Sequence, residues 1–272
     1  IFMYAHNELN TNNNNNHHPA YVDEREEMIV FGGRIRKTMY SDELCVFSVQ
    51  DKQWTIYKNP RDTLVPWPHG RKLASLHYDK HTDCLYMFGG LLPQDMIPKL
   101  QAQGIQDYIT SSDGDIRQTD LWKFDFDNKQ WTCLSPKLPF CTIDEQHVLL
   151  QRSEDTLVVL GGQTMSHTLY QFSLDSATWH SVPLANQYGK PRPDRLRLFS
   201  TVCRQDEMIL FGGKHCDAQR MTNDIWTFHI PTFEWRRIVT DSDSILPCKR
   251  DRTMVALLQN DFLRVVGRTM VT

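Results

Sequence analysis

The sequence of 272 residues lacks a strong net charge, paired cysteines and long hydrophobic runs. Its 30 basic and 33 acidic side chains leave a formal net charge of −3, which argues against a surface built for nucleic acid or an anionic membrane. No stretch reaches the 18 or so apolar residues of a membrane-spanning helix. The seven cysteines are scattered and form no Cys-x-x-Cys pair, a pattern that favours reduced thiols in the cytoplasm or nucleus. A secreted protein with one or two disulfides stays open.

Motifs of catalysis are also missing. The chain has no Gly-x-Ser-x-Gly, no Walker loop, no Gly-x-Gly-x-x-Gly and no His-Glu-x-x-His. The nearest approach to a metal site is two histidine pairs, His17-His18 and His77 with His81, and we expect these to be exposed loop residues. The sequence therefore predicts no catalytic residues, no metal, no cofactor and no enzymatic activity.

What the sequence does contain is a repeat. An apolar run that ends in a glycine pair occurs four times at intervals of about 50 to 70 residues, and a degraded fifth copy lies at 263–268. The glycine pairs are Gly32-Gly33, Gly89-Gly90, Gly161-Gly162 and Gly212-Gly213. After each pair come an alternating segment, a polar turn and a tryptophan, and these tryptophans are Trp54, Trp131, Trp179 and Trp235.

Each unit is predicted to form four strands, which we call a to d in chain order. Strand b is the apolar run, buried on both faces, and strand c alternates between apolar and polar residues. The glycines permit a positive φ or a close backbone approach, and the tryptophan of strand d can fill the gap between neighbouring sheets. Because one four-stranded sheet cannot bury both its faces alone, the sheets are expected to stack around an axis as blades.

This pattern resembles the Kelch repeat, over roughly residues 18–268. The resemblance implies an all-β fold, a Kelch-type β-propeller of four-stranded blades, as one domain over residues 1–272. About four and a half repeats are covered, and since Kelch rings have six or seven blades we expect a fragment of a larger ring. A five-bladed ring closed by exchange of terminal strands is the alternative.

Two insertions interrupt the repeats. Residues 10–18 contain an asparagine run and predict a disordered loop. Residues 91–118 lie between strands b and c of the second unit, and a short helix is expected from Pro98. The apolar side chains of this insertion either pack against the propeller or meet a partner; they are Met96, Ile97, Leu100, Ile105, Tyr108 and Ile109.

Basic residues gather in the segments that enter strand a and in the loops between strands b and c. The candidate partner-binding residues are Arg34, Arg36, Arg71, His167, Arg197, Lys214, His215 and Arg252, with Arg192, Arg220 and Lys249 in the same segments. In Kelch adaptors that capture acidic peptides, arginines entering strand a point into a central bowl, and Arg71, Arg197 and Arg252 occupy similar places. Arginine suits this role because its planar fork holds a carboxylate with two bonds. The alternative is solvated loop charge, or arginines bonded to neighbouring loops.

The function predicted from the resemblance is protein–protein interaction, with a partner peptide bound by loops on one propeller face. A common setting in the family is the substrate receptor of a cullin-RING ubiquitin ligase. An actin or cytoskeletal linker is the alternative, and a propeller-based enzyme such as an oxidase is the second. A protein partner is expected, and neither nucleic acid nor a membrane.

Overall fold

The computed structural model describes residues 20–22, 26–36, 39–62, 64–102, 104, 108–111, 113–139, 147–161, 168–184, 191–194, 196–197, 199–204, 206–215, 220–240, 247–249, 251–257 and 263–268. The predicted disordered loop at 10–18, the pair His17-His18, Gly162 and His167 lie outside these residues.

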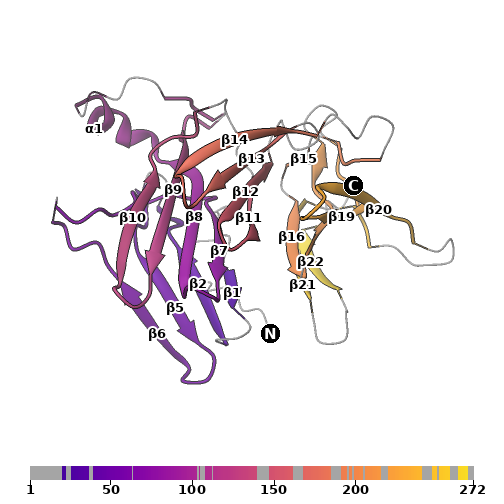
Figure 1. The fold of residues 1–272 in the computed structure, drawn as a ribbon, viewed down its shortest axis with the longest axis horizontal. Coiled ribbons are helices and arrows are strands. Elements are labelled where there is room, and N and C mark those ends of the chain that lie inside the picture. The colour runs from indigo at the N-terminus through magenta and orange to yellow at the C-terminus, as the bar shows by residue number, and fades with distance from the viewer. Residues whose placement is uncertain are drawn as a thin grey trace. The chain divides into compact units, whose positions relative to one another are not determined.

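Four antiparallel sheets of four strands make up most of the structure (Figure 1), and we call them blades 1 to 4. Blade 1 contains β1 (Ala20–Val22), β2 (Glu27–Phe31), β5 (Leu44–Ser48) and β6 (Gln53–Tyr57). Blade 2 contains β7 (Ser75–Asp79), β8 (Cys84–Leu92), β9 (Ile116–Asp125) and β10 (Gln130–Ser135). Blade 3 contains β11 (His147–Ser153), β12 (Thr156–Gly161), β13 (Thr168–Ser173) and β14 (Thr178–Pro183). Blade 4 contains β16 (Ser200–Arg204), β17 (Glu207–Phe211), β19 (Ile225–His229) and β20 (Glu234–Ile238).

The remaining elements are short. The hairpin β21 (Asp251–Leu257) and β22 (Leu263–Arg268) begins a fifth blade. Two small pairs join loop segments: β3 (Arg34–Arg36) with β4 (Met39–Tyr40), and β15 (Leu196–Arg197) with β18 (Lys214–His215). The helices are the 3-10 turn η1 (Gln94–Met96) and α1 (Ile97–Ala102).

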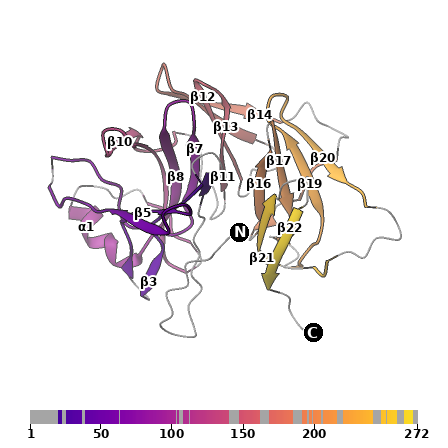
Figure 2. The same ribbon diagram turned by 90° about the horizontal axis from the view of Figure 1, so that it is seen from below.

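The strands of each blade follow one another in chain order, as in a propeller blade. The chain divides into two compact units: unit 1 is Ile1–Thr11, Leu160–Tyr170 and Ser181–Thr272, and unit 2 is Asn12–Val159 and Gln171–His180. Within unit 2, β7 lies against both β1 and β11. Within unit 1, β16 lies against β21 (Figure 2). Within each unit, neighbouring blades therefore meet along their first strands. The predicted Kelch-type β-propeller fold is confirmed.

The glycine pairs form close backbone contacts, as predicted. Gly89 and Gly90 have φ of +67° and +95°, the left-handed region that residues with a Cβ rarely enter. A Cβ on Gly90 would lie 2.8 Å from the carbonyl oxygen of Lys72. In blade 1, the Gly33 amide donates a hydrogen bond to the carbonyl oxygen of Arg71 at 2.7 Å. The pair thus joins strand b to the segment that enters the next strand a.

Two tryptophans of strand d, Trp131 and Trp179, pack onto the preceding blade. The Trp131 ring is 1% exposed, and its centroid lies 5.3 Å from that of Phe31 in blade 1. Trp179 packs on Phe88 of blade 2 at 5.6 Å and donates its indole N–H to Ser135 Oγ at 2.9 Å. Trp54 differs, with 42% of its surface exposed. Blade 1 is the first blade in the described part of the chain, so no preceding blade there covers Trp54.

The insertion at 91–118 has its own small core. Strands β8 and β9 continue beyond the glycine pair, with Leu92 opposite Ile116, so the ends of the insertion are strand and not loop. The predicted helix is confirmed as α1, in which Leu100 packs against Leu92 and Ile116. Three of the expected apolar residues, Met96, Ile97 and Tyr108, line the same cluster, while Ile109 is 46% exposed. Most of these side chains therefore pack within the insertion.

Candidate functional site

Arg71 forms an internal ion pair. Its side chain is 1% exposed, and two guanidinium nitrogens meet the two carboxylate oxygens of Asp120 at 2.6 and 2.9 Å. Nη1 also donates to the Gly89 carbonyl oxygen at 2.8 Å. The Trp122 indole N–H also donates a hydrogen bond to Asp120 Oδ2 at 2.6 Å. Arg71 therefore holds blade 2 together, which agrees with the alternative of arginines bonded to neighbouring segments, and its guanidinium is not presented to a partner.

The other predicted residues are spread over both units. Arg34 and Arg36 lie in the hairpin β3–β4 of unit 2, where Arg36 is exposed and Arg34 Nε is 3.4 Å from the Arg36 carbonyl oxygen. Arg197 pairs through its backbone with Lys214 between β15 and β18, and Arg252 lies in β21. The side chains of Arg197 and Arg252 lie outside what the structure describes.

His77 is not the exposed loop residue that the sequence predicts. It lies in strand β7, and its Nε2 is 3.1 Å from Gln151 Oε1 on β11. Burial lowers the pKa of His77, although the contact with Gln151 acts in the opposite direction. His81 is exposed in the following turn, as expected. Among the described residues, no group of three or more His, Cys, Asp or Glu is placed to hold a metal ion.

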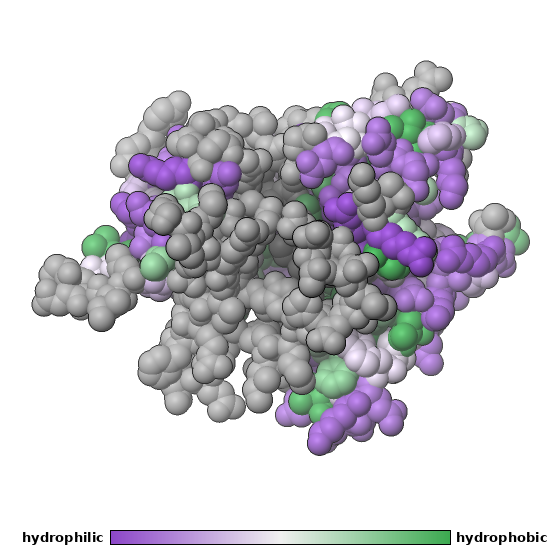
Figure 3. All heavy atoms as spheres, turned by 180° about the vertical axis from the view of Figure 1, so that it is seen from behind, coloured by the Kyte–Doolittle hydropathy of each residue, from purple (hydrophilic) through white to green (hydrophobic). Residues whose placement is uncertain are grey.

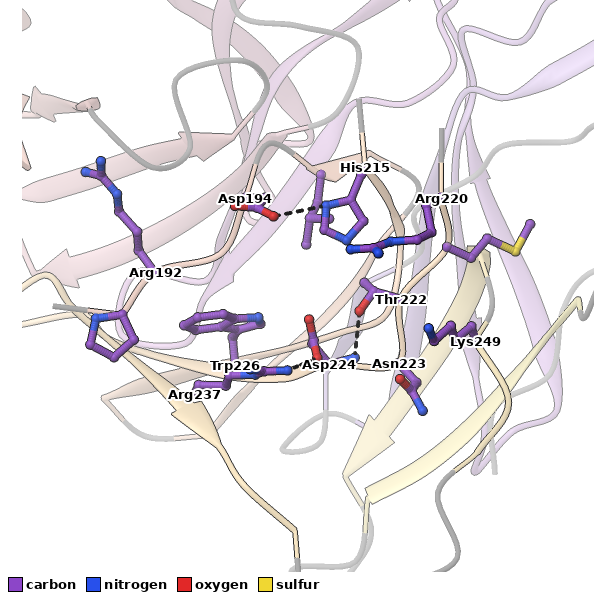
Figure 4. Close-up of a pocket in the computed structure, with 13 residues that line it drawn as sticks. Arg192, Asp194, His215, Arg220, Thr222, Asn223, Asp224, Trp226, Arg237 and Lys249 are labelled. Carbon is purple, nitrogen blue, oxygen red and sulfur yellow. Dashed lines mark hydrogen bonds and ion pairs between the residues drawn. The ribbon is translucent and has the colours of Figure 1, made fainter. Parts of the chain in front are cut away.

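A pocket of about 520 Å³ lies in unit 1, at the end of blade 4 where loops enter and connect its strands (Figure 4). The segment that enters strand a, the loop between strands b and c, and strands β19 and β20 contribute to it. Its lining residues are Pro191, Arg192, Asp194, Leu196, His215, Arg220, Met221, Thr222, Asn223, Asp224, Trp226, Arg237 and Lys249. The pocket thus brings His215 together with Arg192, Arg220 and Lys249 from the basic segments of the sequence.

Backbone hydrogen bonds hold the loop between strands b and c in place. The Thr222 amide donates to the Gly213 carbonyl oxygen at 3.0 Å, and the His215 amide donates to Arg220 at 2.8 Å. The Gly212 amide donates to the Asp224 carbonyl oxygen at 3.0 Å. Because the glycine pair of blade 4, Gly212-Gly213, anchors this loop, the position of the pocket follows from the repeat itself.

Both carboxylates of the pocket face a basic side chain. Arg237 Nη2 lies 2.6 Å from Asp224 Oδ1, and His215 Nδ1 lies 3.2 Å from Asp194 Oδ2 (Figure 4). Partial burial alone would raise the pKa of Asp224, but the hydrogen bond and charge of Arg237, with a contact from Thr222 and the nearby His215, hold that pKa below its usual value. Asp224 is therefore an anion at neutral pH.

The pocket carries an excess of positive charge. Four basic side chains, Arg192, Arg220, Arg237 and Lys249, line it together with only two carboxylates. Arg220 and Lys249 are exposed, and neither has an acidic side-chain partner among the residues that the structure describes. Exposed cations of this kind attract an anionic group.

One wall of the pocket is apolar. Trp226 is buried, and the guanidinium carbon of Arg237 lies 6.0 Å from the centre of its ring. Sequence reasoning did not identify Trp226 and Arg237 as site residues, because they lie within strands and not in loops. The signal that could have found Arg237 is the pair Arg236-Arg237 at the exposed end of strand d.

Figure 3 draws one face of the molecule, coloured by hydropathy. Among the coloured residues of Figure 3, hydrophilic side chains predominate and hydrophobic ones occur in small separate groups. In the part of the chain that the structure describes, no helix has the length and hydropathy needed to cross a membrane.

Comparison with known proteins agrees with the repeat and the blades. Kelch domain-containing protein 10 of Xenopus laevis is 25% identical over 221 residues, which cover 78% of this chain and 46% of that protein. The Mus musculus protein of the same name is 26% identical over 223 residues, covering 78% of this chain and 44% of that protein. The matches thus span less than half the length of these relatives. The model of the KLHDC2/KLHL20/DRC7 Kelch-repeats domain matches residues 10–196 and 107–271, and the chain belongs to this family of Kelch-repeat proteins.

Proposed function

We propose that this chain is a protein-interaction module that binds an acidic segment of a partner protein in the blade 4 pocket. The observation that carries the proposal is the pair of exposed cations, Arg220 and Lys249, beside a pocket whose carboxylates already face Arg237 and His215. Membership of a Kelch-repeat family supports an interaction role for the fold, and the chemistry of the pocket supports the acidic nature of the partner.

The setting that we propose is substrate recognition for a cullin-RING ubiquitin ligase in the cytoplasm or nucleus, with no catalytic role for this chain. The described cysteines Cys45, Cys84, Cys133, Cys203 and Cys248 form no disulfide, which supports the choice of a reducing compartment. A cytoskeletal linker is the competing proposal.

The test is affinity purification of the full-length protein from its own cells, followed by mass spectrometry. The wild type is compared with the double variant Arg220→Ala, Lys249→Ala. The control Lys99→Ala, Lys137→Ala removes the same amount of charge from exposed lysines of unit 2. We expect a partner that the pocket variant loses and the control retains, and we expect cullin or its adaptor with all three proteins.

The other outcomes separate the alternatives. Filament proteins alone would favour the cytoskeletal linker. A partner retained by both variants would contradict binding in this pocket, even if cullin is present. Because exposed charges are screened by salt, the specific partner should also dissociate as the ionic strength of the wash rises.

A further inference from the structure

Blades 2 and 4 share one framework, and the strand registers define which positions correspond. Ser75 lies opposite Phe88 in blade 2, as Ser200 lies opposite Phe211 in blade 4. Phe88 lies opposite Leu121, and Phe211 lies opposite Ile225. The residues one position before and after these strand c residues therefore correspond: Asp120 to Asp224, and Trp122 to Trp226.

The arginine that meets this carboxylate comes from different strands in the two blades. In blade 2, Lys72 pairs with Leu91, the residue after the glycine pair. In blade 4, Arg197 pairs in the same way with Lys214. The residue before each of these, Arg71 in blade 2 and Leu196 in blade 4, therefore occupies the same position. On strand d the arginine is found in blade 4 and an uncharged residue in blade 2. Trp122 lies opposite Cys133, whereas Trp226 lies opposite Arg237. The arginine therefore lies on strand d in blade 4, whereas in blade 2 it lies in the segment that enters strand a.

This exchange changes the accessibility of the guanidinium. The Arg71 side chain is 1% exposed and makes two bonds to Asp120 and one to Gly89. The Arg237 side chain is 54% exposed, and its bond to Asp224 joins one nitrogen to one oxygen. Leu196 carries no polar group, so the segment that enters strand a places no charge beside Asp224 at this position. The two positions that differ between the blades, Leu196 and Arg237, both line the blade 4 pocket. Asp224 and Trp226, the counterparts of Asp120 and Trp122, line it too.

We propose that Leu196 and Arg237 determine the specificity of this pocket for an oxyanion: Leu196 keeps it open, and Arg237 binds the oxyanion together with Arg220 and Lys249. A guanidinium on an exposed strand position can hold a carboxylate or a phosphate group, whereas the buried Arg71 cannot. The inference rests on the proposed function only for the source of the oxyanion, which is an acidic side chain of the partner.

The test restores the blade 2 arrangement in blade 4 with the double variant Leu196→Arg, Arg237→Cys. The arginine at 196 is expected to bond Asp224 from inside and fill the pocket, so the protein should fold and lose oxyanion binding. Two probes are used: inorganic phosphate, followed by the rise in Tm against sodium chloride of equal ionic strength, and a fluorescein-labelled hexaglutamate peptide, followed by anisotropy. We expect the wild type to respond to both, and at least a tenfold weaker response from the double variant.

Two further variants keep the test independent of folding. Arg237→Gln removes an exposed side chain, so it should fold and bind phosphate less well. Leu196→Met keeps a buried apolar side chain at this position and should bind as the wild type does. Equal phosphate binding by the wild type and Arg237→Gln would overturn the inference.

The outcomes for the two proposals differ. If phosphate binding is lost in the variants but hexaglutamate does not bind the wild type, the oxyanion site stands and the acidic-segment proposal falls. If hexaglutamate requires Arg220 and Lys249 but binds equally to Arg237→Gln, the proposed function stands and this inference falls. No response of the wild type to either probe would overturn both.

Discussion

At the scale of single residues, Trp131 and Trp54 hold the same position in neighbouring blades but differ in burial. Trp131 is 1% exposed and contacts Phe31 and Phe124, whereas Trp54 is 42% exposed. We expect Trp131→Ala to lower the free energy of unfolding by roughly 3–5 kcal/mol, because it empties a buried space between two blades. Trp54→Ala should cost less than half of that. Urea unfolding followed by circular dichroism measures both, and equal losses would contradict the packing described.

Two arginine–aspartate pairs allow a second comparison of single residues. Removing one partner of the buried pair by Arg71→Ala should destabilise the protein by about 3–5 kcal/mol, because the Asp120 carboxylate stays buried without its cation. Arg237→Ala breaks an exposed pair and should cost about 1 kcal/mol or less. The melting temperatures and urea midpoints of the two variants provide the measurement. A small loss for Arg71→Ala would show that water reaches Asp120.

The Asp224 carboxyl also predicts a dependence of stability on pH. Its pKa is lowered in the folded state, mainly by Arg237 acting against partial burial. The stabilisation is therefore complete above the ordinary aspartate pKa of about 3.9 and is lost as the pH falls through the lower folded value. Wild type should be more stable than Asp224→Asn at pH 7, and the difference should shrink at pH 3. If the difference in stability between the wild type and Asp224→Asn were the same at pH 7 and pH 3, the charge of Asp224 would not be its cause.

The structural roles of single residues could be predicted from the sequence where those residues recur in each repeat. The glycine pairs and the strand d tryptophans recur in the sequence, so their backbone and packing roles could be read from it. The pairing of Arg71 with Asp120 could not, because the two lie 49 positions apart and the sequence does not give the strand register. For the same reason, Leu196 could not be recognised as the counterpart of Arg71.

At the scale of elements, the insertion between β8 and β9 is fixed to the blades by one carboxylate. Asp115 Oδ2 lies 2.6 Å from Lys72 Nζ and accepts a hydrogen bond from the Tyr40 hydroxyl at 2.8 Å. Burial raises the pKa of Tyr40, and the contact with Asp115 adds to this effect. The sequence predicted the helix of this insertion from Pro98 but not its anchor, because Tyr40 belongs to another blade.

We expect Asp115→Ala to loosen the insertion. Lys72 is 6% exposed at its side chain, so it would lose its anion while still buried. Trypsin should then cut after the exposed Lys99 in α1 several times faster than in the wild type. The control is Asp113→Ala, an exposed residue of the same segment, which should leave the cleavage rate unchanged. Equal rates for both variants would show that the small core around Leu100 holds the insertion alone.

At the scale of the whole molecule, the sequence predicts the fold class because a propeller repeats one unit. The repeat period, the glycine pair and the tryptophan are enough to predict blades 1 to 4 from the sequence, and the strand order of the four sheets confirms these blades. A pocket is harder to predict, since it arises where one repeat departs from the others. The pocket of blade 4 depends on residues from the segment that enters strand a, the loop between strands b and c, and strands c and d, which meet only in the folded sheet.

Because each blade of a propeller is stabilised mainly by its neighbours, stability should differ along the chain. All nine residues of β8 are buried, whereas four of the five residues of β6 are exposed. In hydrogen exchange followed by mass spectrometry, we therefore expect β8 to exchange slowest and β6 fastest among the inner and outer strands of unit 2. Trp131→Ala should speed exchange in both β2 and β8–β9, because the indole packs against Phe31 and Phe124. Uniform exchange over β6 and β8 would instead mean that unit 2 opens only as a whole, and its blades would then be one cooperative unit.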